Sequence, residues 1–259
     1  MANYKGVVFF DLDGTLLNQN AEVTPEIQKT IEQLKKNQIL PVIATGRTKR
    51  EVKKIMEDAK ISALIAMNGM YIEIENQEIY RAEIPAKAIH ELIKFARALD
   101  DEIAYYTPDH IYCSGNNQNL VNHYRHFKVQ SPEVNTQIID QTIFSMLLVG
   151  NQQKEASEIY QKAFPSLTFY RNSPYSIDVT NHGTNKGTGV KQLKQILKIE
   201  NQPSFAFGDG NNDFALLEAC DFKIAMGNAV EPLKRIASYI TASNTQGGIE
   251  QALNYFKLI

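Results

Sequence analysis

Four short apolar runs along the chain each lead into polar residues and glycine. They cover residues 7–10, 40–44, 63–66 and 205–207. Continuous apolar runs of this length are typical of strands that are buried on both faces, as in a parallel sheet. The pattern therefore predicts four parallel strands with polar residues at their carboxyl ends.

Helical patterns separate these runs. Residues 25–36 and 190–197 repeat apolar side chains at a spacing of three or four, and Thr24 and Pro25 are suited to the N-cap and first position of the first helix. The apolar positions of the two helices are Ile27, Ile31, Leu34, Val190, Leu193 and Leu197. Strands that alternate with helices indicate an open α/β sheet. Ligands bind beyond the carboxyl ends of such strands, so we expect the polar clusters to converge there.

The middle of the chain has a different pattern. Its helical stretches alternate with β-like stretches, and none of the latter ends in a group of carboxylates. The helical stretches are residues 86–99, 117–127 and 153–164, and the β-like stretches are residues 103–107, 110–113, 143–149, 167–170 and 176–180. We therefore predict an α+β module over residues 84–182, inserted into a core domain of residues 1–83 and 183–259.

Composition narrows the class of protein. The 27 basic and 29 acidic residues give a formal net charge of −2, so the basic footprint of a nucleic-acid or membrane-surface protein is absent. No apolar run approaches the roughly 18 residues of a membrane span, and the first residues lack a signal-peptide pattern. Cys113 and Cys220 lie far apart and are expected to be reduced thiols. These features predict a cytoplasmic protein without nucleic-acid or membrane partners.

Asp11 and Asp13 follow the first predicted strand in the string Asp-Leu-Asp-Gly-Thr. Side chains two residues apart along a strand point to the same side, so both carboxylates are expected to face the crevice. Neighbouring carboxylates repel each other, and a hard divalent cation relieves that repulsion. Taken alone, Asp-x-Asp-Gly is explained equally well by an ordinary solvated turn.

Asp209 and Asp213 follow the fourth predicted strand in the string Gly-Asp-Gly-Asn-Asn-Asp. The string does not match a dinucleotide-binding fingerprint, because Asp213 occupies the position of the last glycine, and it lacks the pattern of a calcium loop. A turn with a helix cap from Asn212 or Asp213 would explain it alone. Two acidic strand ends in one sheet, however, favour metal binding.

Two further places are suited to a phosphate group. Thr45 and Gly46 offer a hydroxyl group and bare backbone amides at the start of the next helix, although simple capping by Thr45 explains this pair taken alone. Lys186 precedes the second predicted helix and supplies positive charge, although a lone lysine is usually solvated.

Asn68-Gly69, between apolar stretches, indicates a tight hairpin turn.

Taken in order, these motifs resemble those of the haloacid dehalogenase (HAD) superfamily. The set is Asp-Leu-Asp-Gly-Thr from Asp11, Thr-Gly-Arg from Thr45, Lys-Gly from Lys186 and Gly-Asp-Gly-Asn-Asn-Asp from Gly208. The chain is similar to the Cof-type sugar-phosphate phosphatases, whose C2-type cap lies between the second and third motifs, where residues 84–182 fall. The resemblance spans essentially the whole chain. It implies a doubly wound, mostly parallel Rossmannoid core with an inserted α+β cap.

The resemblance also implies a role for each matching residue. Asp11 would be the nucleophile and a ligand of Mg²⁺, and Asp13 would be the general acid and base, with its backbone carbonyl on the metal. Asp209 would be the third metal ligand. The residues in phosphate binding would be Thr45, Gly46, Lys186 and Asn212, with Asp213 in support of the metal site.

The implied reaction is the Mg²⁺-dependent removal of phosphate from a small phosphorylated metabolite, such as a sugar phosphate, through an aspartyl phosphate on Asp11. The cap would act as a lid that selects the leaving group, and Tyr112, Ser114 and Tyr175 are candidates to contact it. Two alternatives stay open: phosphohexomutase-type phosphoryl transfer and a non-catalytic regulator that binds phosphometabolites. The sequence determines neither the substrate nor the oligomeric state, and a monomer is compatible with it.

Overall fold

The computed structural model describes residues 4–126 and 129–259 and divides the chain into two compact units. The first unit comprises Met1–Tyr80 and Asn185–Ile259, and the second comprises Arg81–Thr184. The assignment of a catalytic core to the first unit and of a cap to the second remains a prediction from the sequence.

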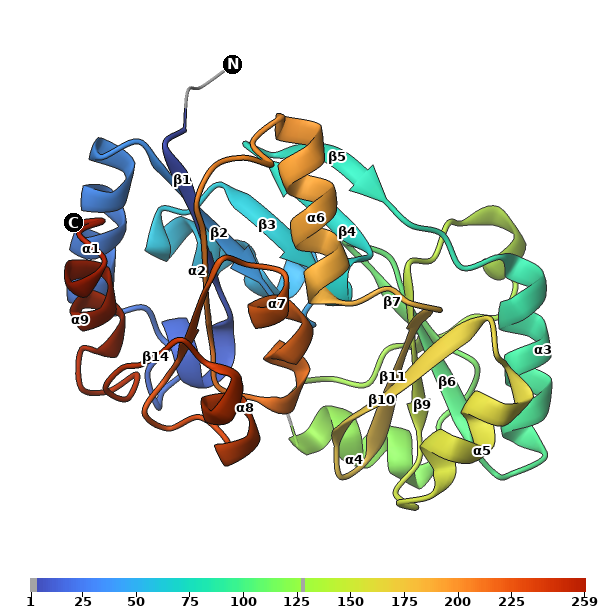
Figure 1. Cartoon of the computed structure of the whole chain (residues 1–259). Coiled ribbons are helices and arrows are strands. Elements are labelled where there is room, and N and C mark those ends of the chain that lie inside the picture. The colour runs from blue at the N-terminus through green and yellow to red at the C-terminus, as the bar shows by residue number, and fades with distance from the viewer. Residues whose placement is uncertain (1–3, 127–128) are drawn as a thin grey trace. The chain divides into compact units, whose positions relative to one another are not determined.

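A sheet in the order β14-β13-β12-β1-β2-β3-β4-β5 forms the centre of the first unit (Figure 1). Its strands are β1 (Gly6–Phe10), β2 (Ile39–Ala44), β3 (Ala63–Ala66), β4 (Tyr71–Ile74), β5 (Gln77–Arg81), β12 (Ser204–Gly208), β13 (Phe222–Ala225) and β14 (Tyr239–Ile240). Neighbouring strands from β14 to β3 are parallel, and β4 is antiparallel to β3. β1 lies between β2 and β12, with Phe10 level with Ile43 and Phe207, so these three strands end at one edge.

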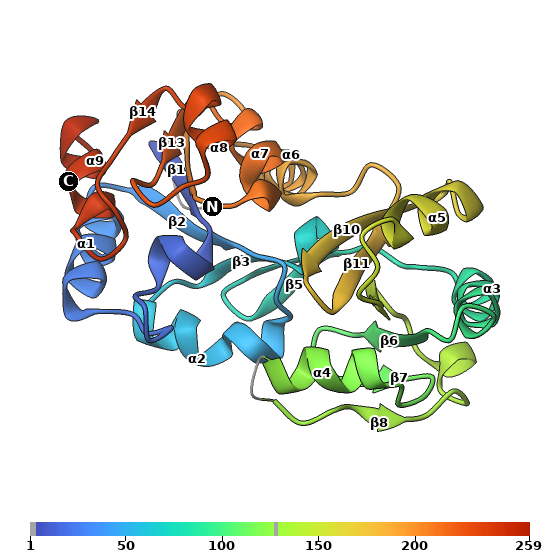
Figure 2. The ribbon, with the colours of Figure 1, turned by 90° about the horizontal axis from the view of Figure 1, so that it is seen from below.

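Helices flank both faces of this sheet. They are α1 (Pro25–Lys36), α2 (Lys49–Ala59), α6 (Lys186–Leu197), α7 (Phe214–Glu218), α8 (Glu231–Ile236) and α9 (Gly248–Tyr255). α1 contacts α2 and α9, whereas α6 contacts α7 (Figure 2). Val7 and Phe9 of β1 pack in one core cluster with Val190 and Leu193 of α6, and Val8 and Phe10 point to the opposite face because strand side chains alternate. The open α/β sheet predicted from the apolar runs is therefore confirmed, as is the doubly wound core that the family resemblance implies.

Local capping explains where these helices begin. Thr24 Oγ1 accepts the amide of Ile27 at 3.4 Å, and Pro25 occupies the first helical position, as predicted. α2 begins with a capping box between Thr48 and Glu51, which satisfies two backbone amides at once. A cap at Thr45 would start this helix at Gly46, whereas α2 begins three residues later, at Lys49, with its cap at Thr48.

The second unit is an α+β module built on a sheet in the order β10-β11-β9-β6-β7-β8. Its strands are β6 (Glu102–Tyr106), β7 (Ile111–Cys113), β8 (Glu133–Val134), β9 (Met146–Gly150), β10 (Leu167–Ser173) and β11 (Ser176–Asn181), and its helices are α3 (Ala86–Arg97), α4 (Gln118–His126) and α5 (Ala156–Ala163). α3 packs against β6 and α5 against β10, whereas α4 contacts β6, β9 and β11. Polar side chains of Ser176, Asp178 and Thr180 alternate along β11 with Ile177 and Val179, so the two faces of this strand differ in polarity.

Small differences from the predicted elements have local causes. Residues 153–155 precede α5 instead of opening it, because the side-chain oxygen of Asn151 accepts the amide of Gln153 at 2.6 Å and turns the chain. Residues 143–145 precede β9, and Phe144 forms only an isolated bridge with Ile84. The predicted helix 117–127 is α4, and Phe127 lies outside the described residues.

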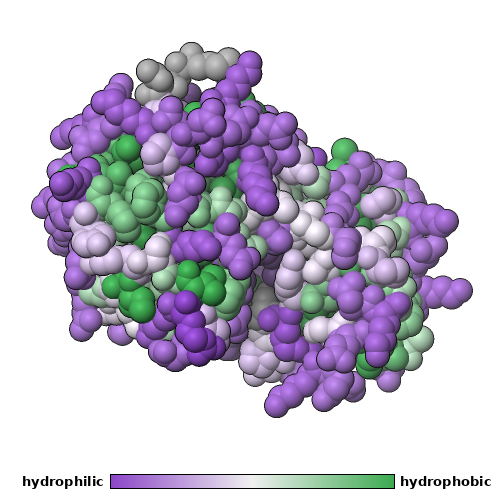
Figure 3. All heavy atoms as spheres, viewed as in Figure 1, coloured by the Kyte–Doolittle hydropathy of each residue, from purple (hydrophilic) through white to green (hydrophobic). Residues whose placement is uncertain are grey.

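Hydrophobic areas on the face shown in Figure 3 are interspersed among hydrophilic residues. None of the described helices is both long enough and apolar enough to cross a membrane.

Cys113 and Cys220 are buried and free, and burial raises the pKa of these thiols to about 11 and about 12.

Candidate active site

The candidate site begins where β1 and β12 end. Asp11 is the first residue after β1 and Asp209 the first after β12, and these strands are parallel neighbours, so both side chains emerge at one edge of the sheet. Carboxylate oxygens of Asp11, Asp209 and Asp213 all lie within 4.8 Å of one another. The structure thus brings Asp11 of the first motif together with both acids of the last motif.

Lys186 lies among these carboxylates. It is the first residue of α6, and its side chain is only 1% exposed. Its ammonium group donates to Oδ1 of Asp11 and, at 2.7 Å, to Oδ1 of Asp213. Lys186 is the only basic side chain that the described contacts place against the three carboxylates. The excess of buried negative charge is the kind that a divalent cation balances.

Asp213 holds this part of the site together. Its second oxygen, Oδ2, accepts the backbone amides of Asp209 and Gly210 at 3.0 Å each, and the residue is completely buried. A β-carbon at residue 208 would lie 2.6 Å from that of Asp213, so the glycine at this strand end allows the close approach. Asp213 therefore fixes both the loop that carries Asp209 and the ammonium group of Lys186.

Asp209 is oriented by the turn that follows β1. Thr15 Oγ1 donates to Oδ1 of Asp209 at 2.8 Å. Gly14 has φ of 81°, and a β-carbon there would lie 2.3 Å from Oδ2 of Asp209. The carbonyl of Gly14 accepts the side-chain amide of Asn228 at 2.8 Å. Both the left-handed backbone and the close carboxylate require glycine at this position.

Asp13 lies apart from the three clustered carboxylates. β1 ends at Phe10 and Leu12–Leu16 forms a tight turn, so the alternation of a strand does not continue as far as Asp13. Its side chain is 61% exposed and is held by Arg47, whose Nε donates to Oδ2 at 3.0 Å while the Nη2 group binds Oδ1. The structure therefore groups Asp11, and not Asp13, with the carboxylates of the last motif, and the orientation of Asp13 toward the crevice stays a prediction.

Thr45 and Gly46 form a loop of their own between β2 and α2. Thr45 is buried, and its hydroxyl oxygen accepts the amide of Arg47 at 3.1 Å. α2 begins only at Lys49, so the residues before it are free of the helical hydrogen-bond pattern. Asn212 is exposed in the turn that follows Gly210, beside the acidic cluster.

Burial makes ionisation costly for these acids. It raises the pKa of Asp11 to about 7, although the ammonium group of Lys186 lowers it in part. Burial also raises the pKa of Asp209 to about 6, against the hydrogen bond from Thr15. Burial alone would lower the pKa of Lys186, but Asp11 and Asp213 raise it, so the amine stays protonated. A divalent cation favours the ionised form of such carboxylates, so this set of hard oxygen donors fits one.

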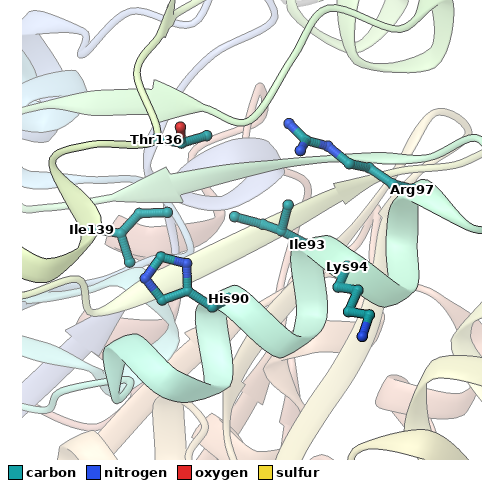
Figure 4. Close-up of a pocket in the computed structure, with 6 residues that line it drawn as sticks. All are labelled: His90, Ile93, Lys94, Arg97, Thr136 and Ile139. Atoms are coloured by element: carbon teal, nitrogen blue, oxygen red, sulfur yellow. The ribbon is translucent and has the colours of Figure 1, made fainter.

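The second unit contains a pocket of different character (Figure 4). Its lining residues are His90, Ile93, Lys94, Arg97, Thr136 and Ile139. His90 pairs with Asp140 at 3.0 Å, and the guanidinium of Arg97 donates to the carbonyl of Ser114 at 2.7 Å. The ionisable side chains that line this pocket are basic, so it differs in charge from the acidic cluster.

The structure also orients the three candidate leaving-group contacts of the second unit. Tyr112 stacks against Tyr105, with ring centroids 6.4 Å apart. Ser114 is buried, and its hydroxyl accepts the amide of Ile103 at 2.9 Å. Tyr112 and Ser114 thus both make contacts within the unit. Tyr175 lies in the turn between β10 and β11.

The fold and this acidic site define an α/β enzyme that acts at the carboxyl ends of a parallel sheet. The sequence model of the haloacid dehalogenase-like hydrolase family matches residues 8–253, and the chain belongs to this family. The protein named "Putative phosphatase YkrA" of Bacillus subtilis (strain 168) is 30% identical over 255 residues, and the match covers 98% of each chain.

Solved structures agree with this assignment. The phosphatase BT1666 from Bacteroides thetaiotaomicron superposes with a TM-score of 0.91 at 25% identity, over 99% of this chain and 96% of that one. The HAD subclass IIB sugar phosphatase BT4131 superposes with a TM-score of 0.84 at 25% identity, over 98% and 99% of the two chains. These matches confirm the predicted superfamily and Cof-type subgroup, and the enzyme class of a HAD-type phosphoric monoester hydrolase.

Sequence reasoning missed several residues that shape the site. Thr15 orients Asp209, and Arg47 holds Asp13, yet neither was assigned a role. A local signal exists for both, because each directly follows a motif glycine and lies at the same edge of the sheet. Asn228 gave no such signal, since its contact with Gly14 joins residues 214 positions apart.

Proposed function

We propose that the chain is a Mg²⁺-dependent phosphatase that removes phosphate from small phosphorylated metabolites through an aspartyl phosphate on Asp11. The observation that carries this proposal is the buried carboxylate of Asp11 at the end of β1, within 4.8 Å of two further carboxylates and paired with Lys186. A phosphate dianion approaches such a cluster only when cations offset the repulsion.

In this proposal Asp11, Asp209 and the backbone carbonyl of Asp13 hold Mg²⁺, and Asp213 supports them. When bound, the ion neutralises carboxylate and phosphate charge. The choice of Mg²⁺ rests on the hard oxygen donors and on the family resemblance. The occupied oxygens of Asp213, held by Lys186 and two amides, support its placement behind the metal ligands.

The phosphate group of the substrate would be held by Thr45, Gly46, Lys186 and Asn212. The backbone amide of Gly46 and the hydroxyl of Thr45, in the loop before α2, are suited to phosphate oxygens. The ammonium group of Lys186 already lies beside Asp11. Lys186 would thus bring the phosphorus atom close to the nucleophile while it offsets negative charge.

The chemistry divides between the two acids of the first motif. A carboxylate oxygen of Asp11 forms a bond to phosphorus while the ester P–O bond breaks, and the carboxyl group of Asp13 gives its proton to the leaving alkoxide. In the second step the carboxylate of Asp13 takes a proton from water, the water oxygen attacks phosphorus, and Asp11 and inorganic phosphate are released. The exposed carboxylate of Asp13, held by Arg47 at this edge of the sheet, would make these transfers.

The substrate class is proposed from the likeness to a subclass IIB sugar phosphatase, which suggests sugar phosphates or similar metabolites. Residues 84–182 would form the cap that selects the leaving group, over a catalytic core of residues 1–83 and 183–259.

The test is the release of inorganic phosphate from p-nitrophenyl phosphate by the whole chain, with and without Mg²⁺ and without an acceptor sugar. The proposal predicts turnover that stops on chelation and returns with Mg²⁺. Transfer only to an added sugar would indicate a mutase. Tight binding of phosphate esters without hydrolysis would indicate a regulator.

A further inference from the structure

The turn Met67–Gly69, which joins β3 to the antiparallel β4, touches two separate parts of the candidate site. The amide of Met67 donates to the carbonyl of Arg47 at 3.0 Å, and the amide of Asn68 donates to the carbonyl of Thr45 at 3.0 Å. These bonds join the turn to the loop between β2 and α2. The predicted hairpin turn at Asn68 is thus also an anchor for this loop.

The side chain of Asn68 lies directly over Gly46. Asn68 is buried and has φ of 54°, a left-handed conformation that asparagine tolerates better than most residues. A β-carbon at residue 46 would lie 3.2 Å from Oδ1 and 3.4 Å from Nδ2 of Asn68. The amide group of Asn68 therefore packs against the bare backbone that the proposed function assigns to phosphate.

Gly69 carries the other contact. It has φ of 94°, and a β-carbon there would lie 2.3 Å from the carbonyl oxygen of Asn185 and 3.3 Å from the amide nitrogen of Gly189. Asn185 is the N-cap of α6, whose first residue is Lys186. The same three-residue turn thus contacts the loop of Thr45 on one side and the helix end that bears Lys186 on the other.

We propose that Asn68 is a positioning residue for the phosphate group of the substrate and for inorganic phosphate. Its side chain, packed on Gly46, holds the Thr45 hydroxyl and the Gly46 amide at the distance from Lys186 that one phosphate group requires. This inference rests on the proposed function. Misplacement of a binding group by about 1 Å can cost roughly 100-fold in rate, so a small contact at this point has a large effect.

The test compares Asn68→Gly with Asn76→Gly in the full chain. Glycine keeps the left-handed backbone at both positions, and Asn76 is an exposed asparagine with φ of 62° in the same unit. We expect Asn68→Gly to raise the inhibition constant of inorganic phosphate about tenfold and to lower kcat/KM for p-nitrophenyl phosphate by roughly 10- to 100-fold. Asn76→Gly should leave both values unchanged. A role in folding alone would lower the melting temperature and the active fraction but not shift the inhibition constant.

Asn68→Asp is the second variant, because it keeps the shape of the side chain and tolerates the same backbone. It places a carboxylate beside Gly46, so phosphate inhibition should weaken at least as much as in Asn68→Gly. An unchanged inhibition constant in a folded Asn68→Gly, or in Asn68→Asp if the glycine variant does not fold, overturns the inference while the proposed function stands. Absence of metal-dependent hydrolysis in the unaltered chain would instead overturn the proposed function.

Discussion

Asp11 and Asp13 stand two residues apart and lie in opposite environments. Asp11 is 6% exposed and paired with Lys186, whereas the side chain of Asp13 is 61% exposed and paired with Arg47. A buried carboxylate held by an ammonium group is suited to a fixed nucleophile. An exposed carboxylate can exchange protons with solvent and with a leaving group.

The first prediction concerns these two acids. Asp11→Asn removes the nucleophile and should abolish turnover. Asp13→Asn removes proton transfer and should slow turnover by about 10²–10⁴-fold while substrate still binds. Steady-state kinetics and direct binding of the substrate measure these effects. Normal turnover by Asp11→Asn would refute its assignment as nucleophile.

The second prediction concerns the pair of Arg47 with Asp13. We expect Arg47→Ala to lower kcat for alkyl phosphates by roughly tenfold, because a poor leaving group needs the proton of a well-placed Asp13. The effect on p-nitrophenyl phosphate should be smaller, because its phenolate leaves without protonation.

Arg50→Ala is the matched control for Arg47→Ala, since Arg50 is exposed on α2. It should change neither reaction. Equal losses on alkyl and aryl phosphates in Arg47→Ala would show that the arginine does not act through Asp13.

The sequence predicted which residues gather at the site better than how they are oriented. The acids of the first and last motifs were expected to converge because their strands are short, apolar and parallel. The position of Asp13 could not be predicted, because it depends on the end of β1 at Phe10 and on a contact with Arg47, 34 residues away.

At the scale of elements, the short turn Met67–Gly69 contacts both the loop of Thr45 and the N-terminal end of α6. Gly69 faces the carbonyl of Asn185 at a distance that leaves no room for a side chain. Gly247 also has a positive φ, but a β-carbon there would have nothing within 4 Å. Both glycines lie in the first unit.

The third prediction follows from this comparison. Gly247→Ala should cost about 1 kcal/mol of the free energy of unfolding, from backbone strain alone. Gly69→Ala adds steric overlap with Asn185 and should cost about 3 kcal/mol. Chemical denaturation followed by circular dichroism measures both, and equal losses would contradict the proposed packing of the turn on α6.

Apolar periodicity predicted the bounds of an element correctly where burial of its apolar side chains alone determines them. β3 begins and ends where the sequence indicated, and α1 matches in both bounds. The start of α2 was missed because its capping box, Thr48 with Glu51, was not recognised. The start of α5 was missed because a side chain of the preceding turn competes for the backbone.

At the scale of the whole molecule, the second unit contains a titratable group that the proposed mechanism does not use. His123 on α4 is buried, and its Nδ1 lies 2.8 Å from the hydroxyl of Ser176. Burial, with a smaller effect of His126, lowers the pKa of His123 to about 4. The folded chain therefore keeps this imidazole neutral at a pH where the unfolded chain protonates it.

The fourth prediction is a loss of stability in mild acid. The contribution of His123 is complete above pH 6.5, its usual pKa, and is lost as the pH falls toward 4, by up to about 3 kcal/mol. The difference in unfolding free energy between the unaltered chain and His123→Gln should shrink over this range. A difference for His123→Gln that stays constant over this range would contradict the prediction.

The central claim is that Asp11 carries the phosphoryl group during turnover. The most direct measurement is an acid quench of the enzyme with substrate and Mg²⁺, followed by borohydride reduction and peptide mass spectrometry. Borohydride converts an aspartyl phosphate to homoserine, so the account predicts homoserine at position 11, and none when Mg²⁺ is chelated. Continued turnover with the label on another residue, or with no labelled residue under the same quench, would contradict it.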